Sequence, residues 1–277
     1  MIAPPDSLGI ADVTAQRRVA GLATPQALQR LTTTDLQQRG VTDIADALRR
    51  FSGVNLRDYG GAGGLKTVSV RGLGAGHTAV SYDGLSVADT RQGQIDLGQF
   101  STNRLGDLSL QNMGEGQLLC PVRNMAAAVV SLHTPWAPQT DALWHGSATL
   151  RQAAFGTYAP SLSVQKRVAR HTSLGIGGDY FFAHNDYPFY VENGVASETL
   201  RRTNSRMQTA TTEVNLHQTL QHDGQITAKA YFYHNYRRLP GMVYLYVNHN
   251  DERLKEETAF AQTRWTQRFG RFQLLAA

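Results

Sequence analysis

The chain has 277 residues, of which 41% are apolar and 18% are charged, and this balance excludes a disordered chain. The formal net charge of +5 comes from scattered cations without a long basic run, which favours solvated surface charges over a nucleic-acid partner. The single cysteine, Cys120, excludes an intrachain disulfide and a thiolate metal site. The 26 glycines and 11 tyrosines favour turn-rich β structure.

The sequence contains no apolar stretch near the ~20 residues that a transmembrane helix needs; the longest apolar run covers 125–130. A membrane location would therefore require a β-barrel or attachment at the surface. Residues 1–5 lack the basic start and apolar core of a secretory signal peptide. Two interpretations remain open: a cytoplasmic chain, or a sequence that begins at or after a processing site.

Residues 1–31 are polar and contain prolines, so we expect an extended segment. Within it, residues 8–14 alternate apolar with small or polar side chains, as a short strand does. Residues 32–51 predict helix, because threonines and Asp43 offer N-caps and apolar residues follow at helical spacing. We expect Ser52-Gly53 to end this helix.

From residue 54 to 133 the pattern changes to short alternating segments separated by glycine turns. Gly60–Gly64 forms a glycine loop, and Asp83-Gly84 is a hairpin turn signal. Residues 32–135 therefore predict a compact α+β unit.

Beyond the linker that begins at Pro135, the segments become long and alternate between apolar and polar residues. They exceed ordinary strands and match the ~9–11 residues of a tilted bilayer crossing. Short turns alternate with longer loops at 185–203 and 238–255, as in a transmembrane barrel; a soluble β-sandwich is the alternative. The expected strands cover 144–154, 158–168, 172–184, 205–220, 225–237 and 256–268, and a seventh begins at Phe272.

Four segments, taken in order, resemble the plug domain of TonB-dependent outer-membrane receptors. They are TDIADALRRFSGV at 42–54, VSVRG at 68–72, VSYDGL at 80–85 and LGDLSL at 105–110. Residues 58–67, 93–98 and 239–241 are further similar to the cobalamin-receptor-like branch of this family in Bacteroidota.

The resemblance implies an α+β plug domain followed by antiparallel transmembrane β-barrel strands. Because such barrels have about 22 strands, residues 136–277 would be the first six to seven strands of an incomplete barrel, as in a gene fragment. The implied location is the bacterial outer membrane, with its lipid as surroundings. The implied partners are TonB with its inner-membrane energising complex, a cobalamin or iron-siderophore ligand and a surface lipoprotein.

Three groups of site residues follow from the resemblance and from strand addition to an extended segment. The candidate TonB-contacting strand comprises Leu8, Gly9, Ile10, Ala11, Asp12, Val13 and Thr14. The candidate ligand-facing plug loops comprise Asp58, Tyr59, Gly60, Gly61, Tyr82, Asp83 and Gly84. The candidate plug core comprises Arg71 and Gly72. We expect Arg71 to pair with a buried carboxylate between plug and barrel wall, and Lys66 to be solvated. A disordered tail and ordinary turns are the alternatives.

Enzyme motifs are lacking in the sequence: it has no H-E-x-x-H, G-x-S-x-G or P-loop, and its aspartates are too dispersed for a calcium loop. We therefore expect no catalytic residue, no cofactor and no metal. Two functions remain: ligand uptake by a gated transporter, and a binding or signalling module that transports nothing.

Overall fold

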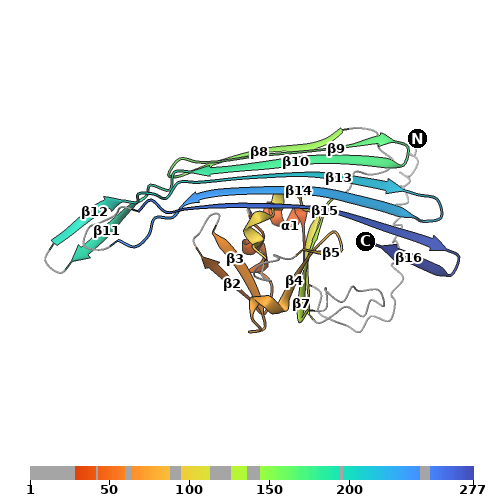
Figure 1. Cartoon of the computed structure of the whole chain (residues 1–277), viewed down its shortest axis with the longest axis horizontal. Helices are drawn as coiled ribbons and strands as arrows, with labels where there is room; N and C mark the ends of the chain where they lie inside the picture. Colours follow the sequence, from red (N-terminus) through yellow and green to blue (C-terminus); the bar gives the residue numbers. More distant parts are fainter. Residues whose placement is uncertain are drawn as a thin grey trace, which may run out of the picture.

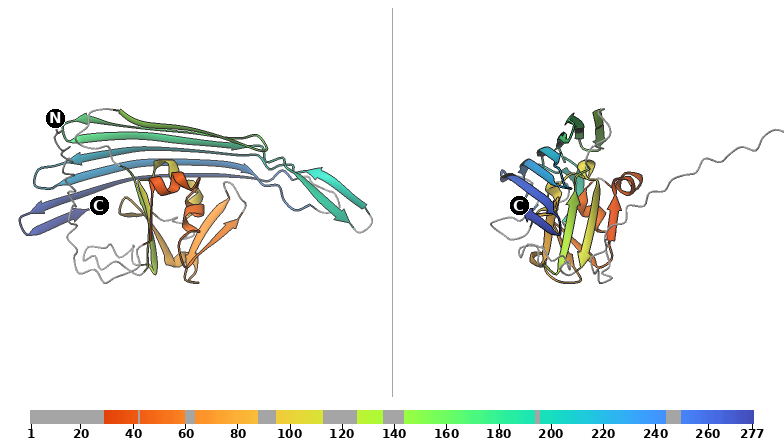
Figure 2. Two further views of the ribbon diagram at one scale, coloured as in Figure 1. Left: turned by 180° about the vertical axis from the view of Figure 1, so that it is seen from behind. Right: turned by 90° about the vertical axis from the view of Figure 1, so that its right-hand side faces the viewer.

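The computed structural model describes residues 29–41, 43–59, 64–87, 95–112, 126–135, 144–193, 196–243 and 250–277. A small α+β body, here called the plug, lies against one face of a long antiparallel sheet, here called the wall (Figure 1). Figure 2 shows the same two layers from behind and from the side. The predicted fold class, a plug followed by antiparallel strands, is confirmed.

The plug is built around a five-stranded sheet of order β1-β6-β7-β4-β5, in which only β4 and β7 run parallel. β2 and β3 form a separate hairpin. The elements are β1 Gln29–Thr32, α1 Thr33–Gln38, α2 Ile44–Leu48, β2 Val54–Tyr59, β3 Leu65–Val70, η1 Ala75–His77, β4 Thr78–Tyr82, β5 Leu85–Val87, η2 Leu97–Gln99, η3 Thr102–Arg104, β6 Asp107–Asn112 and β7 Ala128–His133.

Alternate residues of β6 and β7 form the plug core, because successive strand side chains point to opposite faces. Leu108, Leu110, Val130 and Leu132 are all fully buried. The core cluster also includes Tyr231 from the wall, so plug and wall share one core.

The predicted helix at 32–51 is in fact two short helices. Gly40, with a φ of +61°, lies between α1 and α2, and a left-handed residue does not continue a helix. Asp43 caps α2 as predicted, since its side chain accepts a hydrogen bond from the N–H of Asp46 at 2.9 Å. α2 ends at Leu48, earlier than the predicted stop at Ser52-Gly53. β1 also crosses the predicted boundary between residues 31 and 32.

The wall contains seven strands in the order β16-β15-β14-β13-β10-β9-β8. Their bounds are β8 Trp144–Ala153, β9 Thr157–Ala169, β10 Thr172–Ala183, β13 Met207–Thr219, β14 Gln225–Arg238, β15 Arg253–Phe269 and β16 Phe272–Ala276, close to the predicted ranges. The predicted loop at 185–203 is wrong in one respect, because it carries a hairpin of β11 Pro188–Asn193 and β12 Ala196–Arg201.

The two faces of the wall differ sharply in character. On β14, Lys229, Tyr231, Tyr233 and Asn235 are buried against the plug, while Phe232 between them is 45% exposed on the other face. The outward face presents further large apolar side chains, among them Leu150, Leu162, Ile176 and Val214. Hydrogen bonding satisfies the backbone of each inner strand on both sides, which is the arrangement a bilayer requires.

The connections between the wall strands lie at its two ends (Figure 1). The short turns at 170–171, 220–224 and 270–271 lie at one end. At the other end lie the β11–β12 hairpin and the short turn at 154–156, and there the long connections from β10 to β13 and from β14 to β15 begin. None of the helices in the described ranges has the length and apolar character needed to span a bilayer.

The sheet edges generate a test, because β8 and β16 each pair on one side only in the described structure. Without detergent, residues 1–277 should aggregate through these edges and the apolar face, whereas residues 1–135 should remain monomeric. Size-exclusion chromatography of both chains measures this. A monodisperse, monomeric chain of residues 1–277 would contradict a lipid-facing wall.

Candidate functional site: the interface between plug and wall

Five ionisable side chains meet where the plug lies against β10, β13 and β14. The plug supplies Asp83 and Arg104, and the wall supplies Asp179, Glu213 and Lys229. We call these residues the interface charge cluster. Charges at this depth are costly unless they are paired, so the local structure must supply their partners.

Arg104 at the end of η3 is the plug cation that reaches the wall, and its side chain is only 3% exposed. Its guanidinium lies 2.9 Å from Asp179 Oδ2 and 3.7 Å from Glu213 Oε2, and it donates to the carbonyl of Gly177 at 3.2 Å. A Cβ on Gly177 would approach the Arg104 Cδ to 2.6 Å, so a glycine at 177 lets the arginine cross the strand.

Lys229 is the wall cation that reaches the plug. Its ammonium lies 2.9 Å from Asp83 Oδ2 and 3.9 Å from Glu213 Oε1, and it donates to the Thr134 hydroxyl at 2.6 Å. It also lies 3.3 Å from the centroid of the Tyr82 ring, a cation–π contact. Thr134 precedes the linker into the wall, so Lys229 fixes both the Asp83 turn and the exit of the chain from the plug.

Glu213 lies between the two cations with 1% of its side chain exposed. Besides the cations, it accepts hydrogen bonds from the Tyr82 hydroxyl at 2.8 Å and from the Asn215 amide at 2.8 Å. The cluster therefore contains three carboxylates and two cations, supplemented by neutral donors. The pairs that Arg104 and Asp83 form with the wall exist only when plug and wall are together.

The protonation states in the plug follow from these contacts. Burial disfavours the charged form of the Arg104 guanidinium, but the attraction of the Glu213 and Asp179 carboxylates exceeds this cost. The pKa of Arg104 is therefore raised. Burial, followed by the nearby Glu213 charge, raises the pKa of the Tyr82 phenol well above its ordinary value. Arg104 therefore stays charged and Tyr82 stays a neutral hydrogen-bond donor.

Aromatic contacts surround the charges on the side of the long connections. Tyr82 and Phe100 of the plug pack edge to face at 5.5 Å between centroids, and Phe100 lies 5.7 Å from Tyr231 of the wall. Tyr231 stacks on Phe260 at 4.8 Å and donates its hydroxyl to the carbonyl of Gln99 at 2.7 Å. These rings exclude water from the cluster and strengthen its ion pairs.

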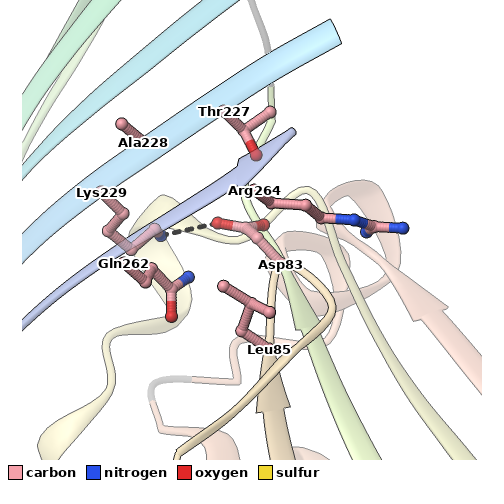
Figure 3. Close-up of a pocket in the computed structure, with 7 residues that line it drawn as sticks. All are labelled: Asp83, Leu85, Thr227, Ala228, Lys229, Gln262 and Arg264. Carbon is pink, nitrogen blue, oxygen red and sulfur yellow. Dashed lines mark ion pairs between the residues drawn. The ribbon is translucent and has the colours of Figure 1, made fainter. Parts of the chain in front are cut away.

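A small pocket opens beside the cluster toward the short turns (Figure 3). Asp83 and Lys229 point toward one another in it, whereas the guanidinium of Arg264 points away from both. Gln262 holds the plug here by donating to the carbonyl of Tyr82 at 2.9 Å. In the described part of the chain, no three His, Cys, Asp or Glu side chains group as they would around a metal ion.

The structure corrects two predicted roles of cations. Arg71 is exposed in a turn, with a φ of +52°, so it does not form the predicted buried pair with the wall; Arg104 does so instead. Gly72 follows it in the same exposed turn, outside the plug core. Lys66 is buried rather than solvated, because it forms an ion pair with Asp43, the cap of α2.

The predicted ligand-facing residues separate into two groups. The first group lies against the wall and comprises Tyr82, Asp83 and Gly84. Tyr82 is 2% exposed, Asp83 pairs with Lys229, and Arg264 approaches Gly84. These three are therefore interface residues rather than ligand-facing ones. Asp58 and Tyr59 end β2, and Tyr59 is 55% exposed. Gly60, Gly61 and residues 8–14 lie outside the described residues.

Asp96, next to η2, is a half-buried carboxyl between plug and wall. Its Oδ1 accepts hydrogen bonds from the N–H groups of Lys66 and Gly98, each at 2.9 Å. Burial nevertheless raises its pKa to about 6, and the carboxylate of Glu256 on β15 adds to the rise.

The chain thus combines a small α+β plug with a long antiparallel sheet, and each part can be compared with known proteins. Residues 21–120 match the family described as TonB-dependent Receptor Plug Domain. The structure is similar to P. aeruginosa FpvA bound to heterologous pyoverdines, with a TM-score of 0.64 and 16% identity over 90% of this chain and 32% of that one.

Two other solved structures are similar to the chain. The ferric citrate transporter FecA gives a TM-score of 0.63 at 15% identity, over 87% of this chain and 37% of that one. The copper transporter OprC gives a TM-score of 0.62 at 16% identity, over 87% of this chain and 34% of that one. The chain thus spans about a third of the length of these solved proteins.

Removal of one cation should expose the dependence of the cluster on pairing. Arg104→Met leaves three carboxylates with one ammonium and should lower the free energy of unfolding by about 3–5 kcal/mol. Arg30→Gln breaks a pair with Asp107 in which Arg30 is 45% exposed, and should cost at most about 1 kcal/mol. Guanidinium-induced unfolding in detergent compares the two. Equal losses would show that the cluster is not a buried, paired unit.

Asp96 predicts a pH dependence. Because its folded pKa of about 6 exceeds the ordinary value of 3.8, the folded state holds the proton more tightly. The protonated Asp96 carboxyl therefore contributes its full stabilisation below pH ~3.8 and loses it as the pH rises through about 6. Over this range the free energy of unfolding should fall by up to about 3 kcal/mol. Asp96→Asn should flatten this decline and stabilise the protein at pH 7. Unfolding free energies that fall equally with pH in both proteins would contradict the assignment.

Proposed function

We propose that this chain forms the plug and the first wall strands of a TonB-dependent transporter in the bacterial outer membrane. The observation that carries the proposal is the interface charge cluster. It fastens a folded plug to the polar face of a wall whose other face is apolar. A wide barrel needs such a plug to avoid leakage, and the plug must be held firmly yet reversibly.

The proposed cargo is a scarce, large ligand, and an iron-siderophore complex is the first candidate. The similar structures of FpvA with pyoverdines and of the ferric citrate transporter FecA support this class. Cobalamin is the second candidate, on the sequence similarity of residues 58–67, 93–98 and 239–241. The exposed Tyr59 ends a hairpin on the side of the plug toward β11 and β12 (Figure 1), which supports a ligand-facing role for Asp58 and Tyr59.

Energy for release would come from TonB and its inner-membrane complex. Residues 8–14 precede β1 at the edge of the plug sheet and have the alternation that strand addition needs. A surface lipoprotein would act at the opposite end, over the long connections.

Proline substitution tests coupling in the natural full-length protein. Ile10→Pro should abolish energised uptake while leaving surface binding unchanged, because proline removes a backbone donor and blocks strand addition. Gln16→Pro, which adds a proline to the same segment outside residues 8–14, should retain uptake. Radiolabelled ferric pyoverdine, ferric citrate and cyanocobalamin serve as ligands, in cells with and without TonB.

The outcomes separate the two functions left open by the sequence. Uptake of none of the ligands by the unsubstituted protein, with binding intact, would favour a binding or signalling module. Equal uptake by Ile10→Pro and the unsubstituted protein would show that residues 8–14 are not the coupling strand.

A further inference from the structure

The outward face of β14 and β15 carries two arginines directly opposite one another. The register pairs Arg238 with Arg253, and the next pair on the same face is Tyr236 with Lys255. Like charges directly opposite across an antiparallel pair are destabilising. Three cations on two adjacent cross-strand pairs therefore need a compensating interaction.

The described part of the chain supplies only a partial one. Glu257 lies one pair further along and contacts Lys255 at 2.9 Å and His234 at 3.1 Å. Neither Arg238 nor Arg253 has a carboxylate within ion-pair distance among the described residues. Tyr236, on the adjacent cross-strand pair of the same face, lies next to both arginines.

The position of this group along the strands indicates what it contacts. Arg238 and Arg253 are exposed at the end of the wall that carries the long connections. Along the same face away from this end, the side chains become apolar, with Phe232 45% exposed and Ala230 beyond it. One polar pair, His234 with Glu257, separates the cations from this apolar surface. If the apolar surface spans a membrane, the cations lie at the depth of the lipid headgroups.

We propose that Arg238, Arg253 and Lys255, with the hydroxyl of Tyr236, bind the phosphate of a membrane lipid. A phosphate offers several acceptor oxygens, which two convergent guanidinium forks and an ammonium complement. Its negative charge removes the repulsion between the two arginines. The lipid tails would then lie along the apolar face next to Phe232. This inference rests on the proposed membrane location.

The test measures lipid binding to the natural full-length protein in neutral detergent micelles. The probes are phosphatidylglycerol and the diphosphorylated glycolipid lipid A, with a phosphate-free diacylglycerol and inorganic phosphate as comparisons. R238Q/R253Q should weaken binding of both phosphate-bearing lipids about 25-fold, since each cation near a lipid surface contributes about a factor of five. R268Q/R271Q removes the same charge near the short turns and should leave binding unchanged.

Native mass spectrometry of retained lipid gives the readout, and heat-modifiable electrophoretic migration checks folding. R238K/R253K keeps the positive charges without the guanidinium groups and should bind lipid at an intermediate level. It also provides a folded variant if the glutamine substitutions disturb the strands. Equal retention by R238Q/R253Q and the unsubstituted protein, or equal loss in both charge-matched double variants, would overturn the site. Binding of inorganic phosphate without preference for lipid would overturn it too. Because binding in micelles is independent of uptake, failure of this site and failure of transport are distinguishable.

Discussion

The burial of charge between plug and wall is the constraint on which the rest of the structure depends. Arg104 and Lys229 come from different layers, and Glu213 lies between them with almost no solvent contact. Separating the layers in a dry environment would leave Arg104 without its carboxylate partners, and such an isolated buried charge costs several kcal/mol. Pairing across the interface therefore selects one position of the plug against the wall.

The same constraint explains why the wall has two unlike faces. Asp179 points inward because the plug supplies its partners, among them Ser101, and apolar residues such as Ile176 point outward. Glycine at 177 belongs to this arrangement, since only a residue without a Cβ allows Arg104 to pass. Strong anchoring by a few ion pairs is compatible with movement, because water that enters the interface can solvate the separated charges.

Sequence alone predicted the long strands well, because alternation that continues over ten or more residues has one simple structural explanation. The β11–β12 hairpin was missed although Asn193-Gly194 is a hairpin signal in the sequence. The contacts between plug and wall could not be predicted from the sequence. Tyr82 and Glu213 are 131 residues apart, and no local pattern shows which plug side chain meets which strand. The sequence near Arg71 therefore could not show that Arg104 is the cation that pairs with the wall.

Single cysteines along β14, in a protein whose Cys120 is replaced by serine, test the central claim most directly. The claim is that the plug covers one face of the wall and lipid covers the other. In bilayers, labels at Ala228, Ala230 and Phe232 should be quenched by brominated lipid, and cysteines at Tyr231 and Tyr233 should resist both this quencher and a water-soluble maleimide. Rapid maleimide reaction at 231 and 233, or quenching without alternation, would contradict the account.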